Sequence, residues 1–98
     1  DLQEGFKTTL ANNLFSPRSG GVSRIKFNVP ASGKVSMKIY DLSGRFVRTL
    51  YEGDAVAGYL QKTWNGKDDD GRYVIPSVYF LHYVYPGGKE VRRIGVKK

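Results

Sequence analysis

Short runs in which apolar and polar residues alternate are the feature that most constrains this chain. Val35, Met37 and Ile39 occupy every second position of one such run. A period of two places these side chains on one face of a β-strand. The tetrapeptide at 41–44, DLSG, then supplies turn residues, and apolar residues resume at Phe46. This stretch predicts a β-hairpin with one apolar face, which a second sheet must cover.

The same alternation recurs along the chain, and glycine or proline interrupts it at short intervals. Residues 23–29 form a clean run that ends before Pro30, which cannot donate to a strand ladder. The run at 78–85 is apolar at both parities except at His82, so we expect a central strand that is buried on much of both faces. Further strands are predicted at 34–40, 46–51, 59–65 and 91–96.

The number and spacing of these runs predict an all-β fold. About seven short strands without a helix-period segment favour an antiparallel β-sandwich of immunoglobulin-like architecture. A chain of 98 residues makes a single domain. We expect residues 1–22 to form a lead-in with an edge strand at 6–10, and residues 23–98 to form the sandwich core. Leu14 and Phe15 are predicted to plug one end of the sandwich.

Composition excludes several classes of function. The chain has no cysteine, which rules out disulfides, thiolate metal sites and a cysteine nucleophile. No apolar run approaches the roughly 18 residues of a membrane span. The net charge of +7 is spread along the chain except at residues 89–98, and no nucleic-acid motif accompanies it. Residues 1–10 lack the layout of a signal peptide, so we expect a piece excised from a longer protein.

Candidate chemical groups are few. Asp68 and Asp70, followed by Gly71, are spaced as in part of a calcium loop, but the downstream bidentate Glu is missing. The alternative is a hairpin turn capped by Asp side chains. The only histidine, His82, has no clustered carboxylates and no cysteine to make a zinc site or a triad. We therefore expect no catalytic residue, no bound metal, no cofactor and no enzymatic activity.

Aromatic residues leave one further alternative open. Tyr79, Tyr83 and Tyr85 share one strand face, and such a row can stack on sugar rings, as in a carbohydrate-binding module. Core packing is the usual reason for such a row. Trp64 is the largest apolar side chain, and we expect it to anchor the core with its indole N–H bonded to a partner.

An ordered set of motifs resembles a known family. The resemblance covers residues 13–98. It is carried by Asn13-x-Phe15-x-Pro17, Ile25-x-Phe27-x-Val29-Pro30, Val35-x-Met37-x-Ile39-Tyr40-Asp41-x-x-Gly44-Arg45-x-Val47-x-Thr49-Leu50, Ala57-Gly58, Trp64-Asn65-Gly66-x-Asp68-x-x-Gly71 and Val78-Tyr79-Phe80. These motifs resemble the immunoglobulin-like domain of the flagellar hook-capping protein family. They also resemble the related C-terminal sorting domains of the bacterial type IX secretion system.

The two relatives imply different roles. In the hook-capping family, the resemblance implies a structural part of the scaffold under which hook subunits assemble. In the sorting family, it implies a C-terminal domain that directs a secreted protein to an outer-membrane translocon. The Gly87-Gly88 turn followed by a basic last strand favours the sorting role. The residues then expected to contact the translocon are Lys89, Val91, Arg92, Arg93, Ile94, Gly95, Val96, Lys97 and Lys98.

The primary hypothesis is thus a non-catalytic targeting or anchoring domain of a larger secreted bacterial protein. Its location would be outside the cell or on the surface of a Gram-negative-type bacterium. Its partners would be proteins, either the translocon or domains of the parent chain, with neither nucleic acid nor a membrane span, and a monomer is the default. The alternatives are a hook-cap-like flagellar domain and a module that binds polysaccharide.

Overall fold

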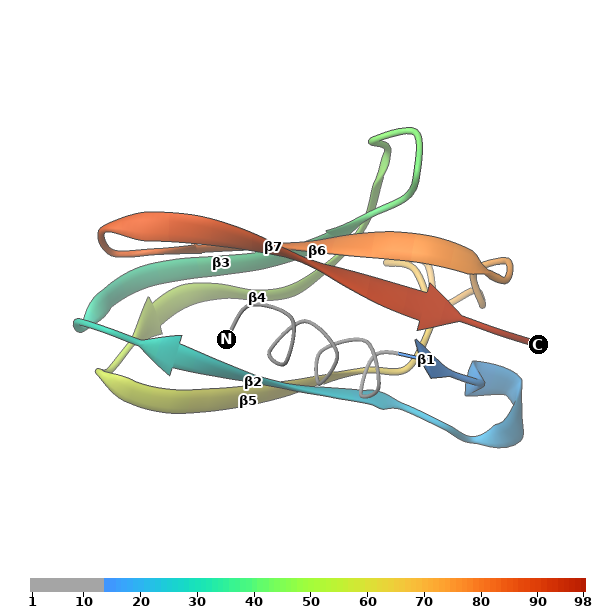
Figure 1. The fold of residues 1–98 in the computed structure, drawn as a ribbon, viewed down its shortest axis with the longest axis horizontal. Helices are drawn as coiled ribbons and strands as arrows, with labels where there is room; N and C mark the ends of the chain where they lie inside the picture. Colours follow the sequence, from blue (N-terminus) through green and yellow to red (C-terminus); the bar gives the residue numbers. More distant parts are fainter. Residues whose placement is uncertain (1–13) are drawn as a thin grey trace, which may run out of the picture.

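Two β-sheets packed face to face make up the part of the chain that the computed structural model describes, residues 14–98 (Figure 1). The elements are β1 (Leu14–Phe15), η1 (Pro17–Ser19), β2 (Ser23–Val29), β3 (Gly33–Tyr40), β4 (Phe46–Ala55), β5 (Gly58–Trp64), β6 (Ser77–Tyr85) and β7 (Gly88–Val96). The larger sheet has the strand order β1-β7-β6-β3-β4, and β2 pairs with β5 in the smaller one. Only the short β1–β7 pairing is parallel among these ladders. The predicted immunoglobulin-like all-β sandwich is confirmed.

The core lies between the two sheets and follows the period-two pattern. Trp64, at the end of β5, is fully buried, with ring centroids 5.7 Å from Phe15 and 5.5 Å from Tyr79. Its indole N–H donates to the carbonyl oxygen of Lys67 at 2.9 Å, as the sequence predicts. The buried hydrophobic residues are Phe15, Ile25, Phe27, Val29, Val35, Met37, Ile39, Trp64, Tyr79, Leu81, Tyr83, Ile94 and Val96.

Strand β4 is longer than the sequence predicts. Residues 52–55 have the composition of a loop, yet they continue the ladder with β3, where Ser36 faces Glu52 and Gly33 faces Ala55. Pairing with an existing strand outweighs the weak strand propensity of these residues. The register shifts between Met37 and Lys38, which gives β4 a bulge. Bulges increase twist and are common at sheet edges, where β4 lies.

Strand β6 is central in the larger sheet, as predicted, but the prediction that it is buried on much of both faces is wrong for its outer face. Leu81 and Tyr83 point inward and are fully buried. Val78 and Val84 point outward and remain 38% and 46% exposed. The reason is that the smaller sheet covers only the inner face of the larger one, and no described element packs on the other side (Figure 1).

Side chains from the larger sheet also form hydrogen bonds to the backbone of β2. The guanidinium of Arg92 on β7 donates to the carbonyl oxygen of Lys26 at 2.8 Å and lies 4.5 Å from the ring centroid of Phe27. The hydroxyl of Tyr83 donates to the carbonyl oxygen of Asn28 at 3.2 Å. Carbonyls two residues apart on a strand point the same way. These two bonds therefore link one side of β2 to the larger sheet.

The N-terminal part is described only from Leu14 onward. Phe15 is buried and contacts Trp64, whereas Leu14 is 57% exposed, so only one of the two residues fills the sandwich end. The edge strand predicted at 6–10 lies outside the described residues. Within residues 14–98, no helix has the length and apolarity needed to cross a membrane.

Replacing Ser23 by Ala is expected to leave the free energy of unfolding unchanged or to raise it by up to about 1 kcal/mol. Ser23 is fully buried, and its hydroxyl has no hydrogen-bond partner among residues 14–98. Removing an unsatisfied buried hydroxyl ends a desolvation cost without breaking a bond. Urea unfolding measures the change. A loss of more than about 1 kcal/mol would contradict the unpartnered state of this hydroxyl.

Candidate functional site

A turn joins β3 to β4 and is built on one aspartate. The Oδ1 atom of Asp41 accepts hydrogen bonds from the backbone N–H groups of Ser43 and Arg45, each at 2.9 Å. It also accepts the Ser43 hydroxyl at 2.7 Å. Gly44 adopts φ of +87°, a left-handed conformation that favours glycine. The sequence Asp-x-x-Gly-Arg therefore closes this turn through its own side chains.

A second turn repeats the same arrangement between β5 and β6. The Oδ1 atom of Asp68 accepts the backbone N–H groups of Asp70 at 2.9 Å and Arg72 at 3.0 Å. Gly71 takes φ of +83°. This is the side-chain-capped turn that the sequence offers as the alternative to a calcium loop. Within residues 14–98, no group of three or more His, Cys, Asp or Glu side chains is placed to hold a metal ion.

Asp69, the second residue of this turn, covers part of the edge of β4. The backbone N–H of Asp69 donates to the carbonyl oxygen of Val47 at 3.1 Å, and its carboxylate accepts the N–H of Thr49 at 3.3 Å. Arg48 donates to the side chain of Asn65 at 2.8 Å. An exposed strand edge is a template for unwanted pairing, and this loop blocks part of it.

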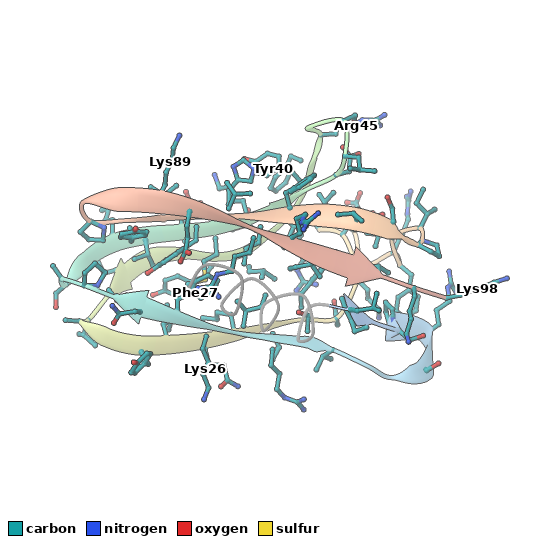
Figure 2. All side chains as sticks on the ribbon, in the orientation of Figure 1. Lys26, Phe27, Tyr40, Arg45, Lys89 and Lys98 are labelled. Atoms are coloured by element: carbon teal, nitrogen blue, oxygen red, sulfur yellow. The ribbon has the colours of Figure 1, made fainter. Side chains whose placement is uncertain are left out.

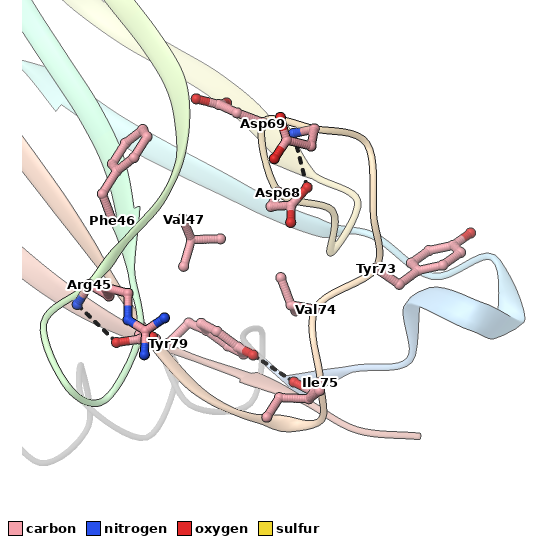
Figure 3. A pocket seen from close by; sticks show the side chains of 11 residues that line it. Arg45, Phe46, Val47, Asp68, Asp69, Tyr73, Val74, Ile75 and Tyr79 are labelled. Carbon is pink, nitrogen blue, oxygen red and sulfur yellow. Dashed lines mark hydrogen bonds between the residues drawn. The ribbon is translucent and has the colours of Figure 1, made fainter.

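A pocket of about 440 Å³ lies between the two turns (Figure 3). Val47 and Val74 point into it from opposite sides, and the Tyr79 hydroxyl donates to the carbonyl oxygen of Ile75 at 2.6 Å (Figure 3). Its lining residues are Asp41, Arg45, Phe46, Val47, Asp68, Asp69, Asp70, Tyr73, Val74, Ile75 and Tyr79. Four carboxylates and one guanidinium make the rim acidic. Asp41 and Asp68 already accept backbone N–H bonds, so they serve the turns.

Two pKa values near the pocket are shifted. Hydrogen bonds, first from the Ser43 hydroxyl and then from the Arg45 N–H, lower the pKa of the Asp41 carboxyl below its ordinary 3.8. Burial raises the pKa of the Tyr79 hydroxyl above 10.0, and the Asp41 carboxylate adds to this shift. Both groups therefore keep their ordinary charge at neutral pH, and neither is poised for proton transfer there.

Replacing Ser43 by Ala is expected to raise the pKa of Asp41 toward 3.8, because it removes the largest cause of the lowering. A carboxyl whose pKa is lowered by folding adds stability above its unfolded pKa, and that stability is lost as pH falls through the folded pKa. The variant should therefore have a lower free energy of unfolding than the wild type at neutral pH. The two free energies should converge in acid, below pH 3.8. Carboxyl NMR titration measures the pKa, and an unchanged value would contradict the role of Ser43. Ser36→Ala, on the outer face of β3, is the control.

The only histidine of the chain is not among the residues that line this pocket. His82 is exposed on the outer face of β6, and its ring centroid is 4.5 Å from that of Tyr40. Its cross-strand neighbours are Lys38 and Val91, and neither can orient an imidazole as a carboxylate would.

The tyrosines proposed as a sugar-stacking row do not form an exposed surface. Tyr79 and Tyr83 are 3% and 0% exposed, and Tyr83 packs on Phe27 with a centroid separation of 4.3 Å. Tyr85 is partly buried and packs against Tyr83 at 4.8 Å. Tyr79 and Tyr83 belong to the core and Tyr85 is half-buried beside it, so the three rings do not make the exposed row that sugar stacking needs.

Comparison with known proteins identifies the family. The sequence model of the FlgD Ig-like domain matches residues 12–82, which include both Asp-x-x-Gly-Arg turns. The chain belongs to the FlgD Ig-like domain family. In fold, it is similar to the crystal structure of FlgD from P. aeruginosa, with a TM-score of 0.62 and 24% identity over 76% of this chain. The similarity spans 61% of that FlgD chain. No protein among the curated sequences matches the chain.

These comparisons support the hook-capping half of the expected resemblance and give no support to the sorting half. The FlgD family match ends at His82, so strand β7 lies outside the matched residues. Most residues predicted to contact a translocon are on β7.

The predicted recognition residues of β7 divide between its two faces. Ile94 and Val96 are 0% and 5% exposed and belong to the core of this FlgD-type sandwich. Arg92 points the same way, bonds to β2 and pairs with Glu90 at 3.1 Å. A partner outside the folded domain could not contact Ile94 or Val96. Alternation with the buried positions already indicates this, because Arg92, Ile94 and Val96 share one parity.

The remaining recognition residues lie outside the core. Lys89, Val91 and Arg93 alternate with the inward residues and point to the outer face of the larger sheet. Gly95 pairs with Leu14 of β1. The backbone N–H of Lys97 donates to the carbonyl oxygen of Phe15 at 2.9 Å, and the carbonyl of Lys98 accepts the Ser16 hydroxyl. The end of the described chain is thus held against β1.

Proposed function

We propose that this chain is a non-catalytic structural domain of an exported flagellar protein of the hook-capping type. The observation that carries the proposal is the FlgD Ig-like family match over residues 12–82. The fold similarity to FlgD from P. aeruginosa supports it. The domain acts outside the cytoplasm, as a rigid part of a scaffold.

The use of the polar residues supports a structural role. Asp41 and Asp68 each cap a turn with a carboxylate oxygen, and Asp69 covers the edge of β4. Arg92 joins the two sheets through the carbonyl of Lys26. These side chains form hydrogen bonds within the domain that stabilise its fold. The domain therefore acts through its shape and surface.

A chimera tests this proposal. The Ig-like domain of P. aeruginosa FlgD is replaced by residues 12–98 of this chain, in a host that lacks its own FlgD. Electron microscopy should show assembled hooks. A folded and exported chimera without hooks would overturn the proposal. A chimera carrying Trp64→Ala is the matched control, because the buried indole holds the core together.

A sorting role is the second candidate, and one observation favours it. Strand β1 pairs with β7 only at Gly95 and Val96, so among residues 14–98 no other strand lies beside that side of β7 from Lys89 to Arg92. An open edge can accept an added strand from a receptor. Lys89 and Arg93 would then speed association with an acidic receptor.

An export assay tests the sorting role. The domain is fused to the C-terminus of an inert reporter in a host with a type IX system. Deleting residues 89–98 would remove core side chains, so the informative variant is the double substitution Lys89→Glu and Arg93→Glu on the outer face. A sorting domain should export the reporter only in the unmodified form. A folded fusion that stays inside in both forms would exclude sorting in that host.

A further inference from the structure

A strip on the outer face of the larger sheet is apolar, although a solvent-facing sheet is usually polar. Phe46, Val78, Val84 and Val91 are 47%, 38%, 46% and 53% exposed. Antiparallel sheets with one wet face normally alternate apolar residues inside and polar residues outside. Strand β6 breaks that rule, because Val78, Phe80 and Val84 point outward and only His82 is polar, and Val91 of β7 lies opposite His82. Contiguous exposed apolar residues with polar neighbours mark interaction surfaces.

Cross-strand pairing shows that these residues adjoin one another. Tyr40 and Phe80 face each other on β3 and β6, and the Tyr40 ring contacts Phe46 at 5.9 Å and His82 at 4.5 Å. We call this surface the outer docking face. Its residues are Tyr40, Phe46, Val78, Phe80, His82, Val84 and Val91, flanked by Lys38, Lys89 and Arg93.

The opposite side of the sandwich provides an internal comparison. The outer face of the smaller sheet carries Arg24, Lys26, Asn28, Tyr59, Gln61 and Thr63, of which only Tyr59 is a large hydrophobic residue. Figure 2 shows Lys26 pointing away from the sandwich on that side, and Lys89 and Tyr40 pointing away on the other. The outer face of the smaller sheet is thus mostly polar, as expected for contact with water, whereas that of the larger sheet carries exposed apolar residues suited to a protein partner.

Charge indicates the kind of partner. Four basic residues lie on or beside the outer docking face, at positions 34, 38, 89 and 93, against two acidic residues, Glu52 and Asp54. Lys38 forms an ion pair with Glu52 at 3.7 Å. The face is thus net positive around an apolar centre. Two copies of it placed together would repel, whereas an acidic surface with an apolar centre is complementary.

We propose that the outer docking face binds a separate protein whose contact surface is apolar at its centre and acidic at its rim. Burial of the valines and aromatic rings supplies affinity, and the lysines and arginine select for acidic partners. This inference does not depend on the flagellar or the sorting role.

The test uses a short synthetic peptide of alternating Glu and Val as the probe, and its Lys and Val counterpart as the matched control. In NMR titrations of the isotope-labelled domain, the acidic peptide should shift amides of β3, β6 and β7 around Lys38, His82 and Val91. Raising salt to about 1 M, where the Debye length is about 3 Å, should weaken binding at least about threefold. The basic peptide should cause much smaller shifts.

Variants place the binding on this face. The pair Val84→Glu and Val91→Glu should weaken the acidic peptide by about tenfold or more, which corresponds to about 1.4 kcal/mol. Tyr59→Glu with Gln61→Glu makes the same charge change on the opposite face and should have no effect. If the first pair does not fold, Val84→Ser with Val91→Ser removes the apolar contact without adding charge and should also weaken binding.

Several results would overturn the proposal. One is equal binding of the basic and acidic peptides. Another is amide shifts confined to β2 and β5. A third is no amide shift at the highest peptide concentration that stays soluble. Concentration-dependent shifts of this face without any peptide would identify a second copy of the chain as the occupant, against the charge argument. Capture by another domain of the parent chain, seen as protection of these amides only in the longer protein, would likewise exclude a separate partner.

Discussion

Trp64→Ala is expected to lower the free energy of unfolding by about 3–5 kcal/mol. The indole is fully buried, and it packs edge-on against Phe15 and Tyr79. Removing the indole leaves a cavity between the two sheets. The Lys67 carbonyl also loses its hydrogen-bond donor. A domain of this size has a total stability near the low end of about 5–15 kcal/mol, so the variant should be largely unfolded in mild denaturant.

Trp64→Phe separates the two contributions. It keeps an aromatic ring in the core but removes the N–H, so the loss should be smaller than for Ala. Urea unfolding followed by circular dichroism is the suitable measurement, because Trp64 is the only tryptophan and its fluorescence disappears in both variants. A loss below about 1.5 kcal/mol for Trp64→Ala would contradict its central place in the core.

Gly66→Ala is expected to cost about 2–4 kcal/mol. An added Cβ would lie 2.4 Å from Cγ and 2.6 Å from Cβ of Pro17, and the proline ring cannot rotate away. The residue also has φ of +78°, which an L side chain rarely adopts. Two separate costs, steric overlap and backbone strain, therefore add at this position.

Gly71→Ala is the matched control for that substitution. Gly71 has nearly the same φ, +83°, but no atom lies within 4 Å of the position its Cβ would take. It should lose only the strain term, about 1–2 kcal/mol. Denaturant midpoints of the two variants measure the difference. Equal losses would show that the contact between Gly66 and Pro17 has no energetic weight.

Much of the fold follows from local sequence rules. The alternation of Ser23 to Val29 gives β2 with its observed bounds, and the size of Trp64 predicts both its burial and its hydrogen bond. The extension of β4 could not be predicted, because it depends on pairing with β3 and not on the residues 52–55 themselves.

The candidate sites likewise include features that local sequence predicts and features that depend on contacts between distant residues. The repeated Asp-x-x-Gly-Arg pattern at 41–45 and 68–72 is visible in the sequence and would have indicated two similar turns. The contact of Arg92 with Lys26, 66 residues away, was not predictable from local pattern. Neither was the exposed outer face of β6, because an apolar strand does not reveal which of its faces another element covers.

We propose that this FlgD-type domain acts through its fold and surface and not through a reactive group. The most direct measurement is the number of hooks per cell in the FlgD chimera carrying one of two substitutions. Asp70→Asn removes one carboxylate of the pocket rim but keeps a polar side chain at an exposed position outside the outer docking face, so hook number should equal that of the unmodified chimera. Gly66→Ala should reduce hook number in proportion to the unfolded fraction. Loss of hooks in a fully folded Asp70→Asn chimera would contradict a role without a reactive group.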